Sequence, residues 1–131
     1  MQKTVDSIKR QNFRDFEVWI IDGNSSEETQ EYLGKLKPPF FYQSKNDKGI
    51  YDAMNKGISL SKGEWFFFLG AEDSFFNDTV LHRVFENIFL ENSGLIAGRV
   101  MYEGNLNPFV YIKKNMIKNP SWSYSMWIRN S

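Results

Sequence analysis

The sequence predicts an α/β fold with a mostly parallel central sheet flanked by helices. Helical and extended segments alternate along most of the chain, as in successive strand-helix-strand units. Residues 64–69 are almost wholly apolar, which is typical of a strand covered on both faces. Acidic residues follow three of the predicted strands, and the carboxyl ends of parallel strands meet at one edge of such a sheet. The length of 131 residues is that of one domain, and we expect residues 1–131 to form it.

The first part of the chain predicts two helices and two strands. Val5 and Ile8 share one face of an opening helix. A polar loop, residues 22–26, links a β-rich run to a second helix, and Pro38-Pro39 ends that helix. The predicted elements are, in chain order, a helix over residues 5–9, a strand over residues 17–21, a helix over residues 27–37 and a strand over residues 40–43.

The remainder of the chain predicts two more helices and three strands. Ala53 and Gly57 belong to an apolar spacing that buries one face of a helix. Asn77 or Asp78 is expected to cap the helix after the third strand. Residues 115–131, rich in Ser, Asn and Trp, are predicted to be irregular. The predicted elements are a helix over residues 50–58, a strand over residues 64–69, a helix over residues 80–89 and strands over residues 95–101 and 108–113.

Composition excludes several classes of protein. Sixteen basic and sixteen acidic residues give a net charge of zero, so no overall charge favours nucleic acid or an anionic membrane. The absence of cysteine excludes a disulfide framework and thiolate metal sites, and agrees with an expected cytoplasmic location. No run approaches the roughly 20 apolar residues of a transmembrane helix. Any anion site is therefore expected to be local.

Residues 47–58 carry the most informative motif, Asp-Lys-Gly-Ile-Tyr-Asp-Ala-Met-Asn-Lys-Gly-Ile. Donors, acceptors and a cation gather at the start of the predicted helix, which suits a phosphorylated ligand. Taken singly, each residue has a structural explanation: Asp47 as a helix cap, Asp52 as a partner of the helix dipole and Lys56 as a solvated side chain. The order and spacing of the whole set point beyond that explanation.

This motif resembles a recurring signature of family 2 glycosyltransferases, which have the GT-A fold. In those enzymes a strand and an acidic motif follow the signature, as residues 65–69 and Glu72-Asp73 do here. The resemblance covers residues 7–78. It implies a Rossmann-like, partial GT-A domain that transfers a sugar from a nucleotide diphosphate sugar, such as a UDP-sugar, to an acceptor hydroxyl with inversion. The implied acceptor is a glycan or lipid-linked molecule of polysaccharide or cell-surface glycan synthesis.

The resemblance also implies roles for five residues. Asp22 matches an aspartate that contacts the nucleotide base, and Asp47 matches an acidic residue near the same base. Lys56 takes the place of the lysine in the family's Asn-Lys-Gly. Glu72 and Asp73 match the acidic motif, whose first residue meets the ribose and whose second meets the metal ion that bridges the diphosphate. That ion would be Mn²⁺ or Mg²⁺, since both bind hard oxygen ligands.

Three positions depart from the family pattern. Lys45 stands where the family has a glutamate, Gly70 where it has an asparagine or aspartate, and Glu72 where it has the first aspartate of the acidic motif. The extra methylene of Glu72 moves its carboxylate, and active sites tolerate little displacement of a reacting group. Gly70 and Glu72 therefore weaken the expectation of a bound metal ion.

The resemblance further predicts an incomplete sheet. Family members begin with a strand that is central in the sheet, whereas residues 5–9 match the helix that follows it. The fold must then either pair the neighbours of that strand directly or borrow a strand from elsewhere. Residues 120–129 resemble a stretch that precedes the catalytic base of inverting members, so the catalytic residue is unknown at this stage.

Two other hypotheses stay open beside glycosyl transfer. The domain is either a catalytically inactive module that binds a nucleotide or a partner protein, or a remnant with no ligand. An unpaired central strand edge would favour association of two chains, such as a homodimer. Turnover separates the enzyme from the binding module, and nucleotide affinity separates the binding module from the remnant.

Overall fold

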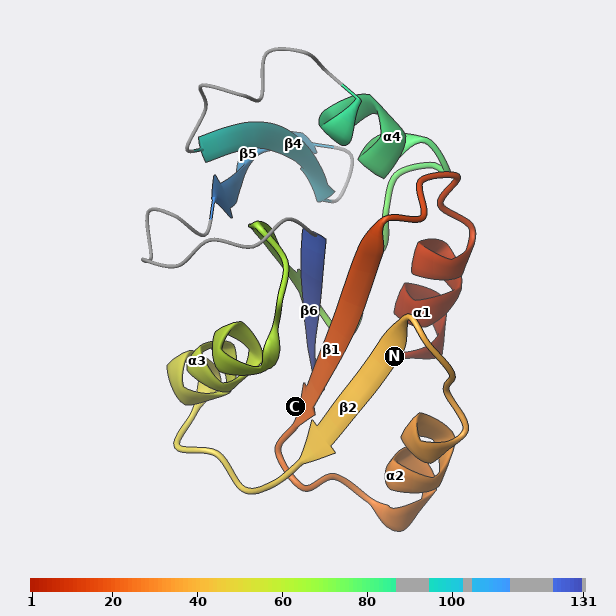
Figure 1. Cartoon of the computed structure of the whole chain (residues 1–131), viewed down its shortest axis with the longest axis vertical. Coiled ribbons are helices and arrows are strands. Elements are labelled where there is room, and N and C mark those ends of the chain that lie inside the picture. The colour runs from red at the N-terminus through yellow and green to blue at the C-terminus, as the bar shows by residue number, and fades with distance from the viewer. Residues whose placement is uncertain (87–94, 103–104, 114–123, 131) are drawn as a thin grey trace.

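The computed structural model describes residues 1–86, 95–102, 105–113 and 124–130, and these residues form an α/β fold (Figure 1). The predicted α/β class is therefore confirmed. The helices are α1 (Gln2–Lys9), α2 (Glu27–Gly34), α3 (Ile50–Leu60) and α4 (Val80–Phe85). The strands are β1 (Phe16–Asp22), β2 (Phe40–Ser44), β3 (Trp65–Gly70), β4 (Leu95–Tyr102), β5 (Asn105–Lys113) and β6 (Tyr124–Asn130).

The strands form one mixed sheet in the order β2-β1-β6-β3-β5-β4. Neighbours among β2, β1, β6 and β3 are parallel. β5 pairs antiparallel with β3, and β4 pairs antiparallel with β5. The four parallel strands consequently end at the same edge of the sheet, toward which the arrows of β1 and β2 point in Figure 1.

The strand β6 occupies the centre of the sheet. It pairs with β1 from Phe16↔Tyr124 to Asp22↔Asn130 and with β3 from Trp65↔Tyr124 to Gly70↔Arg129. The prediction of an irregular tail is therefore wrong for these residues. Tyr, Trp and Ile favour strands. Pairing with β1 on one side and β3 on the other outweighs the weak strand preference of the neighbouring Ser and Asn residues. The sequence left two alternatives for the central position, namely direct pairing of its neighbours or a strand borrowed from elsewhere. The second alternative is confirmed, because β6 lies between β1 and β3.

Apolar side chains cover both faces of the sheet. On one face, α1, α2 and α4 pack through Val5, Leu33 and Leu81 against residues of β1, β2 and β3. On the other face, Ala53 of α3 packs with Ile21, and the two helix layers are visible on opposite sides in Figure 1. The strand over residues 65–70 is thus covered on both faces, as its apolar sequence predicts.

The ends of α2 and α4 differ from the sequence predictions. α2 ends at Gly34 because the chain tightens: Lys35 N donates to Tyr32 O at 3.2 Å, a bond over three residues that closes the last turn. The α4 cap is Thr79, so the prediction of Asn77 or Asp78 is wrong. The Asn77 side-chain oxygen instead accepts from Thr79 N at 3.1 Å, before the helix begins. α4 ends at Phe85 with Glu86 as its C-cap, so the helix predicted over residues 80–89 is shorter than expected, and residues 87–89 lie outside the described residues.

No helix in the described ranges combines the length and apolar character needed to cross a bilayer.

The central position of β6 predicts a severe effect of proline within it. We expect Met126→Pro to destabilise the fold by about 3 kcal/mol or more, because proline removes a ladder donor and clashes in a strand paired on both sides. Chemical denaturation followed by tryptophan fluorescence measures the loss. Met126→Leu is the matched control, since a volume-conserving apolar exchange costs less than about 1.5 kcal/mol. Equal stability of the two variants would contradict the central placement of β6.

Candidate functional site

The carboxyl edge of the parallel strands collects the acidic residues that the sequence singles out. Asp22 is the last residue of β1. Asp47 follows the end of β2, and Glu72 and Asp73 follow the end of β3. Because open α/β sheets bind ligands outside the carboxyl ends of their strands, this edge is the candidate site.

Asp22 organises the loop after β1. Ser25 N donates to Oδ2 of Asp22 at 3.1 Å, and Ser44 Oγ at the end of β2 donates to the same oxygen at 2.6 Å. The residue is fully buried, and these hydrogen bonds satisfy its polar side chain within the protein. In this conformation Asp22 fixes the ends of two neighbouring strands, and direct contact with a ligand requires the loop to move. Ser44 was not singled out by the sequence analysis.

Asp47 lies against the Asp22 loop. A Cβ atom placed on Gly23 would stand 3.2 Å from Asp47 Oδ2, so the aspartate approaches the glycine more closely than most side chains allow. Its other oxygen, Oδ1, accepts a hydrogen bond from Gly49 N at 2.9 Å. Gly49 is the N-cap of α3 and has φ 115°, a left-handed conformation that suits glycine. The structure therefore brings Asp47 against Gly23, the residue that follows Asp22.

Lys56 binds back to the loop that leads into its own helix. Its Nζ donates to Asn46 O at 3.0 Å and lies 3.0 Å from Asp52 Oδ2. Asp52 Oδ2 in turn accepts from Lys48 N at 3.0 Å. Lys56 is thus more than a solvated side chain: it ties α3 to the segment on either side of Asp47.

These bonds shift the titration of Asp52. The backbone N–H of Lys48, followed by the side chain of Lys56, lowers the pKa of the Asp52 carboxyl below its ordinary value of 3.8. The ionised form of Asp52 is therefore favoured, and its contacts persist throughout the neutral pH range.

Asp73 folds back onto the end of β3. Its Oδ2 accepts a hydrogen bond from Gly70 N at 2.9 Å, and Asp73 N donates to Gly70 O at 3.1 Å. A Cβ atom at residue 70 would lie only 2.6 Å from Asp73 Oδ2, so a side chain there is incompatible with this placement. Gly70, which departs from the family pattern, thus leaves room for the Asp73 carboxylate.

Glu72 extends away from the turn. Its side chain is 89% exposed, and Oε1 lies 3.2 Å from the α-amino nitrogen of Met1. The acidic pair is separated from the end of β1, where Asp22 lies, by β6, that is, by two interstrand spacings or roughly 10 Å. The predicted residues therefore form two groups on one edge and not a single cluster.

Three buried polar residues, Thr4 and Ser7 of α1 and Gln11 two residues beyond it, support the acidic loop, and none of them was among the predicted site residues. Thr4 Oγ1 donates to Ala71 O, Ser7 Oγ accepts from Phe75 N, and Gln11 Oε1 accepts from Leu81 N. A usable signal was present, because Thr4, Ser7 and Gln11 fall at helical spacing on the same face as Val5 and Ile8.

The described residues suit a divalent cation only with help from a ligand. No group of three or more His, Cys, Asp or Glu side chains within the described ranges is arranged to hold a metal ion. Mg²⁺ is commonly held by one or two carboxylates together with substrate phosphates, and Mn²⁺ accepts similar oxygen ligands. Asp73 is exposed and uses Oδ2 for the bond to Gly70, so Oδ1 is the oxygen that fits such an ion.

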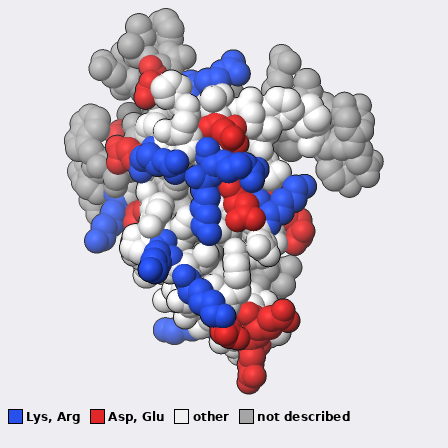
Figure 2. All heavy atoms as spheres, turned by 90° about the vertical axis from the view of Figure 1, so that its right-hand side faces the viewer, with Lys and Arg blue, Asp and Glu red and all other residues white. Residues whose placement is uncertain are grey.

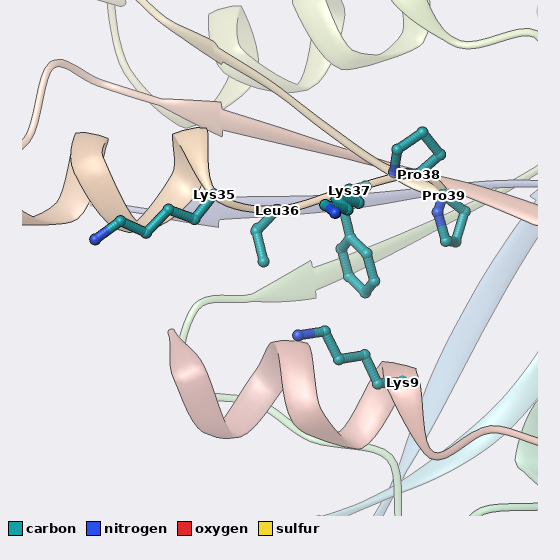
Figure 3. A pocket seen from close by; sticks show the side chains of 7 residues that line it. Lys9, Lys35, Leu36, Lys37, Pro38 and Pro39 are labelled. Atoms are coloured by element: carbon teal, nitrogen blue, oxygen red, sulfur yellow. The ribbon is translucent and has the colours of Figure 1, made fainter.

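A separate groove lies near the amino ends of the parallel strands, where β2 begins. Its volume is about 340 Å³. Lys9 Nζ stands 5.8 Å from the ring centre of Phe40, in a cation–π contact (Figure 3). On the face of the molecule that Figure 2 shows, lysine and arginine side chains gather across the middle. Its lining residues are Lys9, Lys35, Leu36, Lys37, Pro38, Pro39 and Phe40.

This groove has a structural explanation for its charge. Lys9 lies in the last turn of α1 and Lys35 caps the carboxyl end of α2, where cations balance the helix dipoles. None of the acidic residues of the candidate site lines it.

The fold defines the class: an open α/β protein whose candidate ligand site lies at the carboxyl ends of parallel strands. The chain belongs to glycosyl transferase family 2, whose family model matches residues 1–129. The predicted family and its GT-A fold are confirmed.

Several curated proteins resemble the chain in sequence. The PGL/p-HBAD biosynthesis glycosyltransferase of Mycobacterium bovis (strain BCG / Pasteur 1173P2) is 40% identical over 84 residues, which are 61% of this chain and 33% of that protein. An uncharacterized glycosyltransferase of Mycobacterium tuberculosis (strain ATCC 25618 / H37Rv) is 39% identical over 88 residues, 66% of this chain and 34% of that protein. Another, from Rickettsia typhi (strain ATCC VR-144 / Wilmington), is 26% identical over 99 residues, 74% of this chain and 30% of that protein.

The chain spans about a third of the length of these relatives. No solved structure matches the chain significantly.

The bonds of Asp52 give a titration that can be measured. We expect Lys56→Met to raise the pKa of Asp52 but to leave it below 3.8, because the larger cause, the N–H of Lys48, remains. Carboxyl-carbon NMR during an acid titration reports the value. The folded state has the lower pKa, so this stabilisation is present above the unfolded value and lost as pH falls through the folded one. Lys62→Met, on the exposed turn after α3, is the control and should leave Asp52 unchanged.

The contact between Gly70 and Asp73 predicts strong coupling between the two positions. Gly70→Ala should force the Asp73 carboxylate away and cost about 1 kcal/mol or less, the worth of one exposed hydrogen bond. In an Asp73→Ala background the same change should be neutral, since the obstructing oxygens are gone. Thermal denaturation of the four proteins gives this double-mutant cycle. Equal costs in both backgrounds would rule out the fold-back of Asp73.

Proposed function

We propose that the protein binds a nucleoside diphosphate sugar at the carboxyl edge of β1, β2 and β3 and belongs to an enzyme that transfers the sugar to an acceptor hydroxyl with inversion. One observation carries the proposal: the fold places Asp47 against the Asp22 loop and puts Glu72 and Asp73 on the same edge, two strands away. Membership of glycosyl transferase family 2 supports it.

In this proposal, the two acidic groups bind different parts of the donor. Asp22 and Asp47 serve the nucleotide base, with Asp22 shaping the loop and Asp47 packed against Gly23 of that loop. Lys56 holds the segment around Asp47 in place through Asn46. Glu72 serves the ribose, and Asp73 holds a divalent cation, Mn²⁺ or Mg²⁺, beside the diphosphate. The proposed base is uracil.

Glycosyl transfer requires that the charge on the leaving diphosphate be stabilised and that a proton be removed from the acceptor hydroxyl. The bond between the anomeric carbon and the diphosphate oxygen breaks, and a bond from that carbon to the acceptor oxygen forms. The diphosphate leaves with the electron pair, and a divalent cation stabilises that charge when bound. The proton of the acceptor hydroxyl passes to a general base. Among the described residues we assign no side chain to that base.

We also propose the class of acceptor and the compartment. The printed name of the Mycobacterium bovis relative assigns that protein to PGL/p-HBAD biosynthesis, which supports a biosynthetic role. The proposed acceptor is a hydroxyl group of a glycan or of a lipid-linked molecule in polysaccharide or cell-surface glycan synthesis. The proposed location of the reaction is the cytoplasm, where a nucleotide sugar is available.

Calorimetric titration with UDP tests the site. In the presence of Mn²⁺ we expect Asp73→Asn to weaken UDP binding about tenfold, because a charged ligand to the ion is lost. Without metal, Asp73→Asn should bind UDP as the unmodified protein does. Asp47→Asn should weaken binding under both conditions, since its role concerns the base.

The control for these variants is Asp15→Asn, an exposed aspartate just before β1, at the edge of the sheet away from the site. It should leave binding unchanged with and without Mn²⁺. A parallel titration with GDP tests the choice of base. If Asp47→Asn and Asp73→Asn both bound UDP like the Asp15 control, the assignment of this edge as the donor site would be wrong.

A further inference from the structure

Thr4 is buried in α1 and donates through Oγ1 to the main-chain carbonyl of Ala71, directly before the acidic pair. We infer that Thr4 is a positioning residue for Asp73 and acts through this carbonyl. The inference rests on the proposed function, because it concerns the orientation of the carboxylates at the donor site.

The buried face of α1 holds the acidic loop along its length. Thr4, Ser7 and Gln11 are 0%, 1% and 0% exposed, respectively. Burial of a polar side chain is costly unless it is hydrogen-bonded. Each of the three makes at least one hydrogen bond to a main-chain group of the segment after β3, while Ser7 Oγ also donates to Thr4 O and Gln11 Nε2 also donates to Ser7 O. Thr4 and Ser7 of α1, with Gln11 two residues beyond that helix, therefore fix successive points of that segment, namely Ala71, Phe75 and the pair Asn77 and Leu81.

The bond from Thr4 acts at the turn that carries both carboxylates. Asp73 N donates to Gly70 O at 3.1 Å, which closes a turn with Ala71 and Glu72 at its two central positions. The carbonyl of Ala71 belongs to the peptide plane between those two residues, and a peptide plane moves as a rigid unit. Fixing that carbonyl sets the orientation of the turn. The fold-back of Asp73 onto Gly70 N depends on the same turn.

The other two buried polar residues provide an internal comparison. Ser7 and Gln11 reach the chain only after the acidic pair, at Phe75 and beyond. Their loss should loosen the loop between β3 and α4 without changing the peptide plane between Ala71 and Glu72. The effect on Asp73 should therefore be specific to Thr4.

The first experiment needs no ligand. Amide hydrogen exchange is followed by NMR in the unmodified protein and in Thr4→Val, Thr4→Ser and Ser7→Ala. Valine keeps the shape of threonine and removes the donor. We expect Thr4→Val to speed exchange of the Gly70 and Asp73 amides about tenfold, and Thr4→Ser to restore it. Ser7→Ala should speed exchange at Phe75 and leave Gly70 and Asp73 unchanged.

The second experiment measures UDP binding with Mn²⁺ by calorimetry in the same four proteins. Thr4→Val should lose about tenfold in the metal-dependent affinity, with rescue by Thr4→Ser and no change in Ser7→Ala. Equal losses in Thr4→Val and Ser7→Ala, or fast exchange at Gly70 and Asp73 with unchanged affinity, would overturn the inference. If Thr4→Val does not fold, Thr4→Ala removes the same donor and is read in the same way.

The two experiments separate the inference from the proposed function. If the unmodified protein binds neither UDP nor GDP, the proposed donor site is wrong and the role of Thr4 at that site falls with it. If the unmodified protein binds UDP with Mn²⁺ and Thr4→Val binds it equally well, the proposed function stands and the positioning role of Thr4 is wrong.

Discussion

The pairing of β6 with β1 on one side and β3 on the other is the constraint on which the rest of the structure depends. It joins the strand that ends at Asp22 to the strand that leads into the acidic pair. Without this pairing, the two halves of the candidate site have no fixed separation. The two apolar layers also depend on it, because each layer spans residues of β1 and β3 and needs a continuous sheet beneath it.

The candidate site combines a rigid part and an exposed part. Asp22 is fully buried and bonded to Ser25 and Ser44, so the loop after β1 is set by the protein itself. Glu72 and Asp73 stand on an exposed turn, supported from below by α1. This division suits the proposed donor site. A loop that is already fixed limits the entropy lost on binding, and exposed carboxylates remain solvated by water.

Local patterns in the sequence predicted much of the fold and the edge on which the site lies. The apolar run of β3 and the helical spacing in α3 depend on near neighbours, and the rule of strand ends predicted that Asp22, Asp47 and the acidic pair lie on one edge of the sheet. β6 could not be predicted in this way, because its strand depends on partners far away in the sequence. The approach of Asp73 to Gly70 and the bond from Thr4 to Ala71 are likewise contacts in space. The buried polar face of α1 was visible in the sequence, but its partners were not.

The place of β6 in the sheet has a consequence for how the protein acquires its structure. A central strand that comes from the far end of the sequence makes the fold rich in non-local contacts, since Phe16 pairs with Tyr124. Such topologies fold slowly, because closing a long loop costs conformational entropy before the stabilising contacts form. On the ribosome, β1 and β3 are synthesised before β6, so the strands that β6 joins are made before β6 itself. During synthesis, that interval is when the chain is most exposed to pairing with the wrong strand.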